Sequence, residues 1–219
     1  MAREAHLLGV FHRLRQYDPL DGPQTLQWIC IDASHNCNMI HDWEILLSHA
    51  VLHCDALGRF ELLLSHCKLT RLYRNCFTRR ATSASLHTLK LDLSNNNLEE
   101  IGLSQFLFIA DSGIHSLDLD LSYNRVSSKG AKVLCRLRKA SRLICLKLLL
   151  RGNRVTVNAV DDLALLLQPM LSAPSRHVHL DLRQNLLSLA DQQMLLHRQN
   201  VGLQKTSGWF SGSIVLLTK

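Results

Sequence analysis

LHTLKLDLSNNNL, residues 86–98, carries the pattern L-x-x-L-x-L-x-L-x-x-N-x-L, and the same pattern recurs along the chain. It returns most clearly in IHSLDLDLSYNRV (114–126) and LICLKLLLRGNRV (143–155). Weaker copies occupy residues 26–36, 57–69 and 175–187. Self-similarity at a nearly constant interval of 28 to 32 residues predicts a repeat architecture of six units.

The asparagine of the pattern is the most informative position. It is expected to lie in the turn after a strand, where backbone groups need hydrogen-bond partners and a side-chain amide can join one turn to the next. Cysteine is a weaker donor and acceptor than an amide, so the unit that has a cysteine here is expected to be the softest. The predicted turn ladder comprises Asn36, Cys67, Asn96, Asn124, Asn153 and Asn185.

The hydrophobic period changes at each ladder position. Before it, apolar residues alternate, which is typical of a strand. After Asn124, the residues Val126, Gly130, Leu134 and Leu137 follow at intervals of three and four, which indicates a helix. Strands stack about 4.8 Å apart, whereas helices pack about 8–10 Å apart. We therefore expect an α/β solenoid, a curved stack of six strand–turn–helix units with the parallel sheet concave and the helices convex.

The repeat pattern resembles the leucine-rich repeat family, and specifically its ribonuclease-inhibitor-like class, over residues 26–200. The resemblance implies protein ligands on the concave face. A stack of repeats needs capped ends. We expect residues 1–25 to form a capping helix and loop, and residues 201–219 to form a C-terminal cap with a closing strand at 214–217. Such a strand would leave an edge with which a partner chain could pair.

Composition limits the function classes. Hydrophobic residues make up 47% of the 219 residues and charged residues 20%, a globular balance with no apolar run long enough to span a bilayer. The seven cysteines include no C-x-x-C pair, which favours a reducing, intracellular compartment. We expect a cytoplasmic protein; a mitochondrial location remains the alternative, because residues 2–16 predict an amphipathic helix with several arginines.

No catalytic signature or cofactor motif is present in the sequence. His49 and His53 have a spacing that zinc ligands use, but no further ligands follow at a recognised spacing. The sequence therefore predicts a protein that is not an enzyme, with no cofactor and no metal.

Two surfaces are candidates for binding. On the concave face, we expect acidic residues in the middle of the solenoid, basic residues towards the C-terminus, and leucines exposed for apolar contacts. The expected partner-binding residues are Asp32, Glu61, Leu63, Lys90, Asp92, Asp118, Asp120, Lys147, Leu149, Arg151, Asp181 and Arg183. The leading hypothesis is a protein–protein interaction module that acts as a scaffold or subunit of an intracellular assembly.

The second surface is a basic stripe on the convex face. Its spacing places several Lys and Arg side chains on one helix face, which suits contact with phosphates. The candidate phosphate-contacting residues are Lys129, Lys132, Arg136, Arg138, Lys139 and Arg142. The alternative hypothesis is therefore a structural component of a ribonucleoprotein particle, such as a mitochondrial ribosome, that contacts RNA through basic helices. The excess of 25 Lys and Arg over 18 Asp and Glu permits an anionic partner without requiring one.

Overall fold

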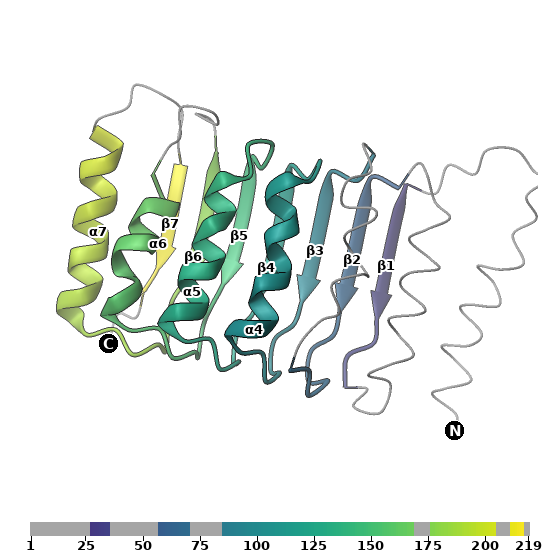
Figure 1. Cartoon of the computed structure of the whole chain (residues 1–219), viewed down its shortest axis with the longest axis horizontal. Helices are drawn as coiled ribbons and strands as arrows, with labels where there is room; N and C mark the ends of the chain where they lie inside the picture. Colours follow the sequence, from purple (N-terminus) through teal and green to yellow (C-terminus); the bar gives the residue numbers. More distant parts are fainter. Residues whose placement is uncertain (1–26, 36–56, 71–84, 169–175, 205–210, 217–219) are drawn as a thin grey trace, which may run out of the picture.

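The computed structural model describes residues 27–35, 57–70, 85–168, 176–204 and 211–216. Within these residues, seven parallel strands form one sheet in which every strand pairs with the next one along the chain. Figure 1 shows them side by side in sequence order. The strands are β1 (Trp28–Asp32), β2 (Arg59–Leu63), β3 (Thr88–Asp92), β4 (Ser116–Asp120), β5 (Cys145–Leu149), β6 (His177–Asp181) and β7 (Ser211–Val215).

Helical segments follow the strands and lie on one face of the sheet (Figure 1). The α-helices are α4 (Glu100–Leu103), α5 (Ser128–Cys135), α6 (Val160–Leu166) and α7 (Leu189–Gln204). Short 3₁₀ segments adjoin three of them: η1 (Ser104–Asp111), η2 (Arg136–Lys139) and η3 (Val157–Ala159). This arrangement of repeated strand–turn–helix units is an α/β leucine-rich-repeat solenoid. The predicted N-terminal cap lies outside the described residues. The described part of the predicted C-terminal cap contains β7, which begins three residues before the expected closing strand.

The strand register follows the sequence repeat without a slip. Leu89 of β3 pairs with Leu117 of β4, and Leu117 pairs with Leu146 of β5. These leucines are buried beneath the helices, and so is the residue that lies two positions further along each strand. Because side chains alternate between the two faces of a strand, the residues between them point to the opposite face. Burial of the leucines therefore fixes which residues each repeat presents to solvent.

The helix expected after Asn96 differs from the prediction. The α-helical part covers only Glu100–Leu103, and the 3₁₀ segment Ser104–Asp111 continues it. Leu103, Phe106 and Ile109 are all buried at intervals of three. Side chains three apart eclipse one another in a 3₁₀ helix. In a 3₁₀ helix, the three residues therefore lie in one line that faces the core.

The asparagine amides join neighbouring repeats. Asn124 Oδ1 accepts from the Leu98 backbone N–H at 3.0 Å, and Asn124 Nδ2 donates to the carbonyl oxygens of Leu93 at 2.9 Å and Leu121 at 3.1 Å. Leu98 and Leu93 belong to the preceding repeat, whereas Leu121 belongs to the same one. Asn96, Asn153 and Asn185 make the same three kinds of hydrogen bond. Each amide thus satisfies buried backbone groups that neither strand nor helix can satisfy.

Cys67 occupies the ladder position in its repeat, and Asn36 lies outside the described residues. Cys67 Sγ donates to the Ala33 carbonyl oxygen at 3.2 Å, so it also reaches the preceding repeat. A thiol is the weaker hydrogen-bonding group. The Cys67 backbone N–H is itself bound by Asn96 Oδ1 at 3.0 Å, so the next amide along the ladder supports this turn.

Replacing Asn124 with alanine should destabilise the fold more than replacing Asn185 with alanine. Asn124 is buried, and its loss leaves the buried Leu98 N–H without a partner, at about 1–3 kcal/mol for an unsatisfied group. It also removes one of the two amide hydrogen bonds that the Leu93 and Leu121 carbonyls each accept, the other coming from Asn96 or Asn153. The Asn185 bonds are only partly buried, so water can replace them. Urea unfolding of Asn124→Ala and Asn185→Ala measures the difference. Equal and negligible losses of unfolding free energy would refute the structural role of the ladder.

Candidate functional site: the open face of the sheet

The face of the sheet opposite the helices is the candidate site, and we call it the open face. It is built from the first, third and fifth residues of each strand, which lie in rows across the sheet. The middle row is Cys30, Glu61, Lys90, Asp118, Lys147, His179 and Ser213. The row at the carboxyl ends of the strands is Asp32, Leu63, Asp92, Asp120, Leu149, Asp181 and Val215.

Most charges of the middle row are paired across strands. Lys147 Nζ lies 3.0 Å from Asp118 Oδ2, and Lys90 Nζ lies 3.7 Å from Glu61 Oε2. The sequence predicts Glu61 as a partner-binding residue on the accessible face, but its side chain is buried, with only 6% of the residue exposed. Arg59, two positions earlier on the same face of β2, donates to Glu61 Oε1 from Nε at 2.7 Å and covers it.

Asp181 is the second residue of the expected set that is not accessible. It is 4% exposed, and Arg183 binds it through Nε to Oδ1 at 3.0 Å and through Nη2 to Oδ2 at 2.6 Å. Burial acts to raise the pKa of Asp181, but the side-chain and backbone hydrogen bonds of Arg183 outweigh burial and hold the pKa below its ordinary value. Arg183 is thus occupied by an intrachain partner.

Asp92 and Asp120 are two adjacent carboxylates of the open face without a cation. They face each other on β3 and β4, and among the described residues neither forms an ion pair. Each accepts one backbone hydrogen bond from the serine two residues later. Burial raises the pKa of Asp120, and the neighbouring charges of Asp92 and Asp118 raise it further, against the hydrogen bonds from Ser122. The centre of the open face therefore carries uncompensated negative charge.

Leu63 and Leu149 flank this acidic centre in the same row. We expected exposed leucines, but both side chains are half-buried. The neighbouring strands cover part of each side chain, since Leu63 pairs with Asp92 and Leu149 pairs with Asp120. Each leucine still leaves apolar surface beside a carboxylate.

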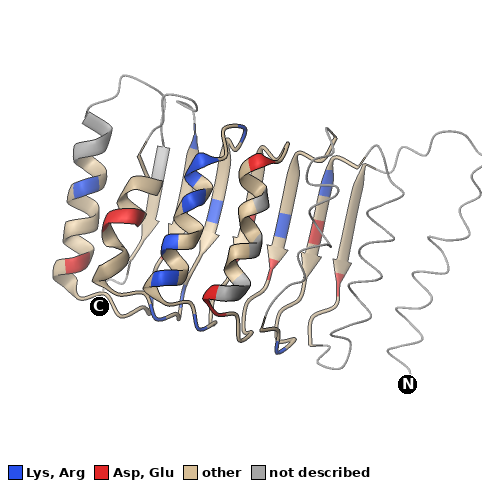
Figure 2. Cartoon of the chain, in the orientation of Figure 1, with Lys and Arg blue, Asp and Glu red and all other residues tan. Residues whose placement is uncertain are grey.

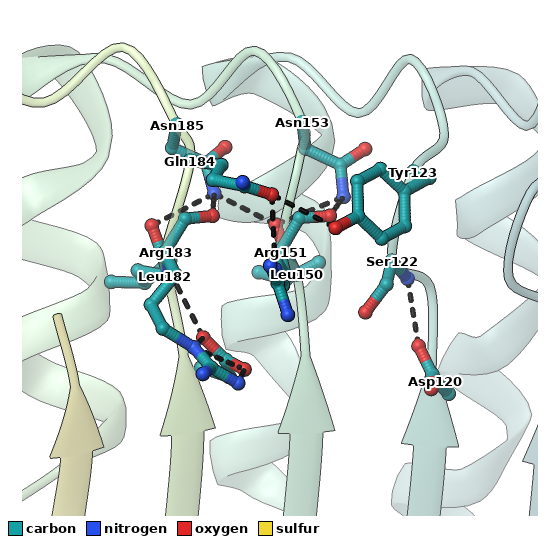
Figure 3. A network of polar contacts seen from close by, with 11 residues as sticks. Asp120, Ser122, Tyr123, Leu150, Arg151, Asn153, Leu182, Arg183, Gln184 and Asn185 are labelled. Atoms are coloured by element: carbon teal, nitrogen blue, oxygen red, sulfur yellow. Dashed lines mark hydrogen bonds and ion pairs between the residues drawn. The ribbon is translucent and has the colours of Figure 1, made fainter. Parts of the chain in front are cut away.

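A polar network lies where the chain leaves β4, β5 and β6 (Figure 3). Arg151, which belongs to the expected set, donates from Nε to Gln184 Oε1 at 2.9 Å. Tyr123 Oη donates to the same oxygen at 2.9 Å. The sequence interpretation missed Tyr123 and Gln184. Both immediately precede a ladder asparagine, and that shared position could have identified them.

The basic stripe lies on the helix-covered side. Figure 2 shows Lys and Arg along α5 and the segment after it. Lys129, Lys132, Arg136 and Lys139 are exposed, and Lys132 Nζ lies 3.6 Å from Asp162 Oδ2. Arg142 is also exposed.

Arg138 differs from the rest of the stripe. It is half-buried, and its buried Nε has no hydrogen-bond partner among the described residues. Its carbonyl oxygen accepts from the buried Arg176 at 3.0 Å. Arg138 therefore takes part in the packing between repeats and is less accessible than the other basic residues of the stripe.

The described part of the chain was compared with what a metal site and a membrane-spanning helix require. No group of three or more His, Cys, Asp or Glu residues there could hold a metal ion, and His49 and His53 lie outside it. A shallow hollow over β4 to β6 brings Cys145 beside His177 and Lys147. No helix in the described residues has both the length and the apolar character needed to cross a bilayer.

Comparison with known proteins gives a limited result. No family model matches the chain, and no curated protein matches it significantly. Among solved structures, the chain is similar to internalin C2 from Listeria monocytogenes, at 16% sequence identity and a TM-score of 0.37. That similarity covers 77% of this chain and 74% of the internalin chain.

Replacement by asparagine should change the melting temperature in opposite directions at Asp120 and Asp181. Asp120 has a raised pKa, so its ionisation opposes folding, and Asp120→Asn should raise the melting temperature at neutral pH; this gain should vanish as the pH falls through the carboxyl range. Asp181 has a lowered pKa, so Asp181→Asn should lower the melting temperature at neutral pH and lose that effect in acid. Thermal unfolding from acid to neutral pH checks both. Parallel pH profiles for the two variants would contradict the assigned environments.

Proposed function

We propose that the chain is a non-enzymatic protein-interaction module that binds its partner on the open face, as a scaffold or subunit of an intracellular assembly. The observation that carries this proposal is the pair of carboxylates, Asp92 and Asp120. They lie side by side on adjacent strands, lack a cation among the described residues, and have half-buried leucines on either side.

The energetics of the pair support a binding role. Like charges directly opposite each other on neighbouring strands destabilise a sheet. Burial is the main cause of the raised pKa of Asp120, and the charge of Asp92 raises this pKa further. A partner's lysine or arginine would remove the repulsion, and apolar side chains beside that cation would cover Leu63 and Leu149. The partner's contact segment is therefore basic and apolar.

The helical repeats support assignment to the ribonuclease-inhibitor-like class of leucine-rich repeats, because α5, α6 and α7 place a helix in successive repeats. Three free thiols among the described residues support an intracellular, cytoplasmic location: Cys30, Cys135 and Cys145. Burial raises the pKa of Cys135 to about 12, so this thiol is unreactive and serves packing.

The second candidate function is RNA binding in a ribonucleoprotein particle, mitochondrial ribosomes included. The observation that favours it is the row of exposed cations Lys129, Lys132, Arg136 and Lys139 on α5 and η2. Lys132 already lies near Asp162, which reduces the charge available to a phosphate. We rank this function second because a solvated helix face carries similar charge without a ligand.

Neutralising the acidic pair should abolish partner capture without unfolding the chain. In Asp92→Asn/Asp120→Asn, the amide oxygens can still accept from Ser94 and Ser122, so the turns keep their hydrogen bonds. The tagged full chain is used to capture proteins from an extract of its native source, with and without ribonuclease. The amount of protein captured should be about tenfold or more lower with the variant than with the wild type. Loss of one partner of a buried charge pair weakens affinity by more than about tenfold.

Glu99→Gln/Asp111→Asn is the matched control, since it neutralises two exposed carboxylates of the helix layer. It should leave capture unchanged. Capture that survives in the Asp92 and Asp120 variant would refute the proposal. Capture that ribonuclease abolishes, and that is lost when the four stripe cations are changed to glutamate, would instead establish the second candidate.

A further inference from the structure

The Tyr123 ring occupies space that is open only because residue 152 is a glycine. Tyr123 and Gly152 occupy the same position in successive repeats, and both have a left-handed backbone, with φ of 55° and 67°. A Cβ atom added to Gly152 would lie 2.4 Å from Tyr123 Cδ1 and 2.7 Å from Cε1. The tyrosine ring therefore lies directly over the Gly152 backbone, in space that any other residue would fill.

The third repeat completes the arrangement. Gln184 holds the equivalent position in the next unit, and its Oε1 accepts from Tyr123 Oη and Arg151 Nε, each at 2.9 Å. The Arg151 guanidinium carbon lies 5.6 Å from the centre of the Tyr123 ring. Figure 3 shows the three side chains meeting at the ends of the strands. We call Tyr123, Arg151 and Gln184, seated on Gly152, the rim platform.

The Arg151 guanidinium of the rim platform is not held in an ion pair, although its charge also helps to lower the pKa of Asp181. Arg151 forms no ion pair among the described residues, and its hydrogen bond to Gln184 uses only Nε. Both Nη groups therefore remain available as a fork for an oxyanion. Arg183, one repeat further, is engaged with Asp181 and cannot serve in the same way. Tyr123 is 42% exposed, so the ring can contact a ligand while it fixes Arg151.

We propose that the rim platform binds a carboxylate of the protein partner, from an aspartate or glutamate side chain. The two Nη groups of Arg151 donate hydrogen bonds to the two carboxylate oxygens. This inference rests on the proposed function and adds a second anchor to it. Fixing the guanidinium before binding reduces the entropy lost on association. Tyrosine and arginine are also the residue types that dominate binding energy at protein interfaces.

The neighbourhood of the rim platform favours a protein ligand over RNA. Asp92 and Asp120 lie on the adjoining strands and would repel a continuous row of phosphates. A protein segment can instead present one cation to Asp120 and one carboxylate to Arg151. These positions are one strand and two residues apart, about 8 Å between Cα atoms. The partner's segment should therefore carry a basic and an acidic side chain at that separation.

The test uses a dye-labelled, end-blocked peptide of alternating glutamate and alanine, titrated with the full chain at low salt and followed by fluorescence anisotropy. Arg151→Lys retains the positive charge but loses the pair of Nη donors. Gly152→Ala displaces the Tyr123 ring without replacing Arg151 itself. Each should weaken binding about tenfold, the effect expected for losing charge-assisted hydrogen bonds. Arg125→Lys makes the same change at an exposed arginine outside both proposed binding surfaces; it is the matched control and should bind like the wild type.

Circular dichroism establishes whether Gly152→Ala folds; if it does not, Arg151→Lys decides alone. Absence of wild-type binding, or equal losses in Arg125→Lys and Arg151→Lys, would overturn the proposal. Tighter binding of an oligouridylate with the same dependence on Arg151 would show a phosphate site and also overturn it. Because the peptide assay needs no natural partner, its failure leaves the proposed function of Asp92 and Asp120 to be judged by the capture experiment.

Discussion

One side-chain amide per repeat is the constraint on which the rest of this structure depends. The chain must turn sharply between a strand and a helical segment, and the turn leaves buried backbone groups that neither element satisfies. Asn124 satisfies groups in its own repeat and in the one before it. Repetition of this contact holds successive turns at the same height, and the strands therefore stay in register along the sheet.

A fixed register has a functional consequence, because it places side chains of different repeats at set distances on the open face. The leucines beneath the sheet and the amides at its edge provide the stability, so the open face can hold groups that oppose folding. Asp120 is such a group, since burial and two neighbouring carboxylates raise its pKa. The rim platform uses the same regularity, because Tyr123, Gly152 and Gln184 meet only when three turns are level.

The spacing of leucines and asparagines was sufficient to predict the solenoid, the parallel order of the strands and the composition of each row. It was not sufficient to predict accessibility within a row. Glu61 and Asp181 are buried because Arg59 and Arg183, two residues away on the same face, fold over them. Side-chain conformations of this kind leave no periodic signal. The rim platform also escaped prediction, because it depends on a glycine making room for a tyrosine 29 residues earlier.

Native-state hydrogen exchange measures the central interaction most directly. The Leu98 and Val126 amides donate to Asn124 and Asn153, lie outside the strands, and have no other partner that would protect them. If the amide ladder holds the fold together, these two N–H groups exchange only through global unfolding, at rates matching Leu119 in the centre of the sheet. Exchange of Leu98 and Val126 at the rate of unprotected surface amides, with Leu119 still protected, would contradict the account.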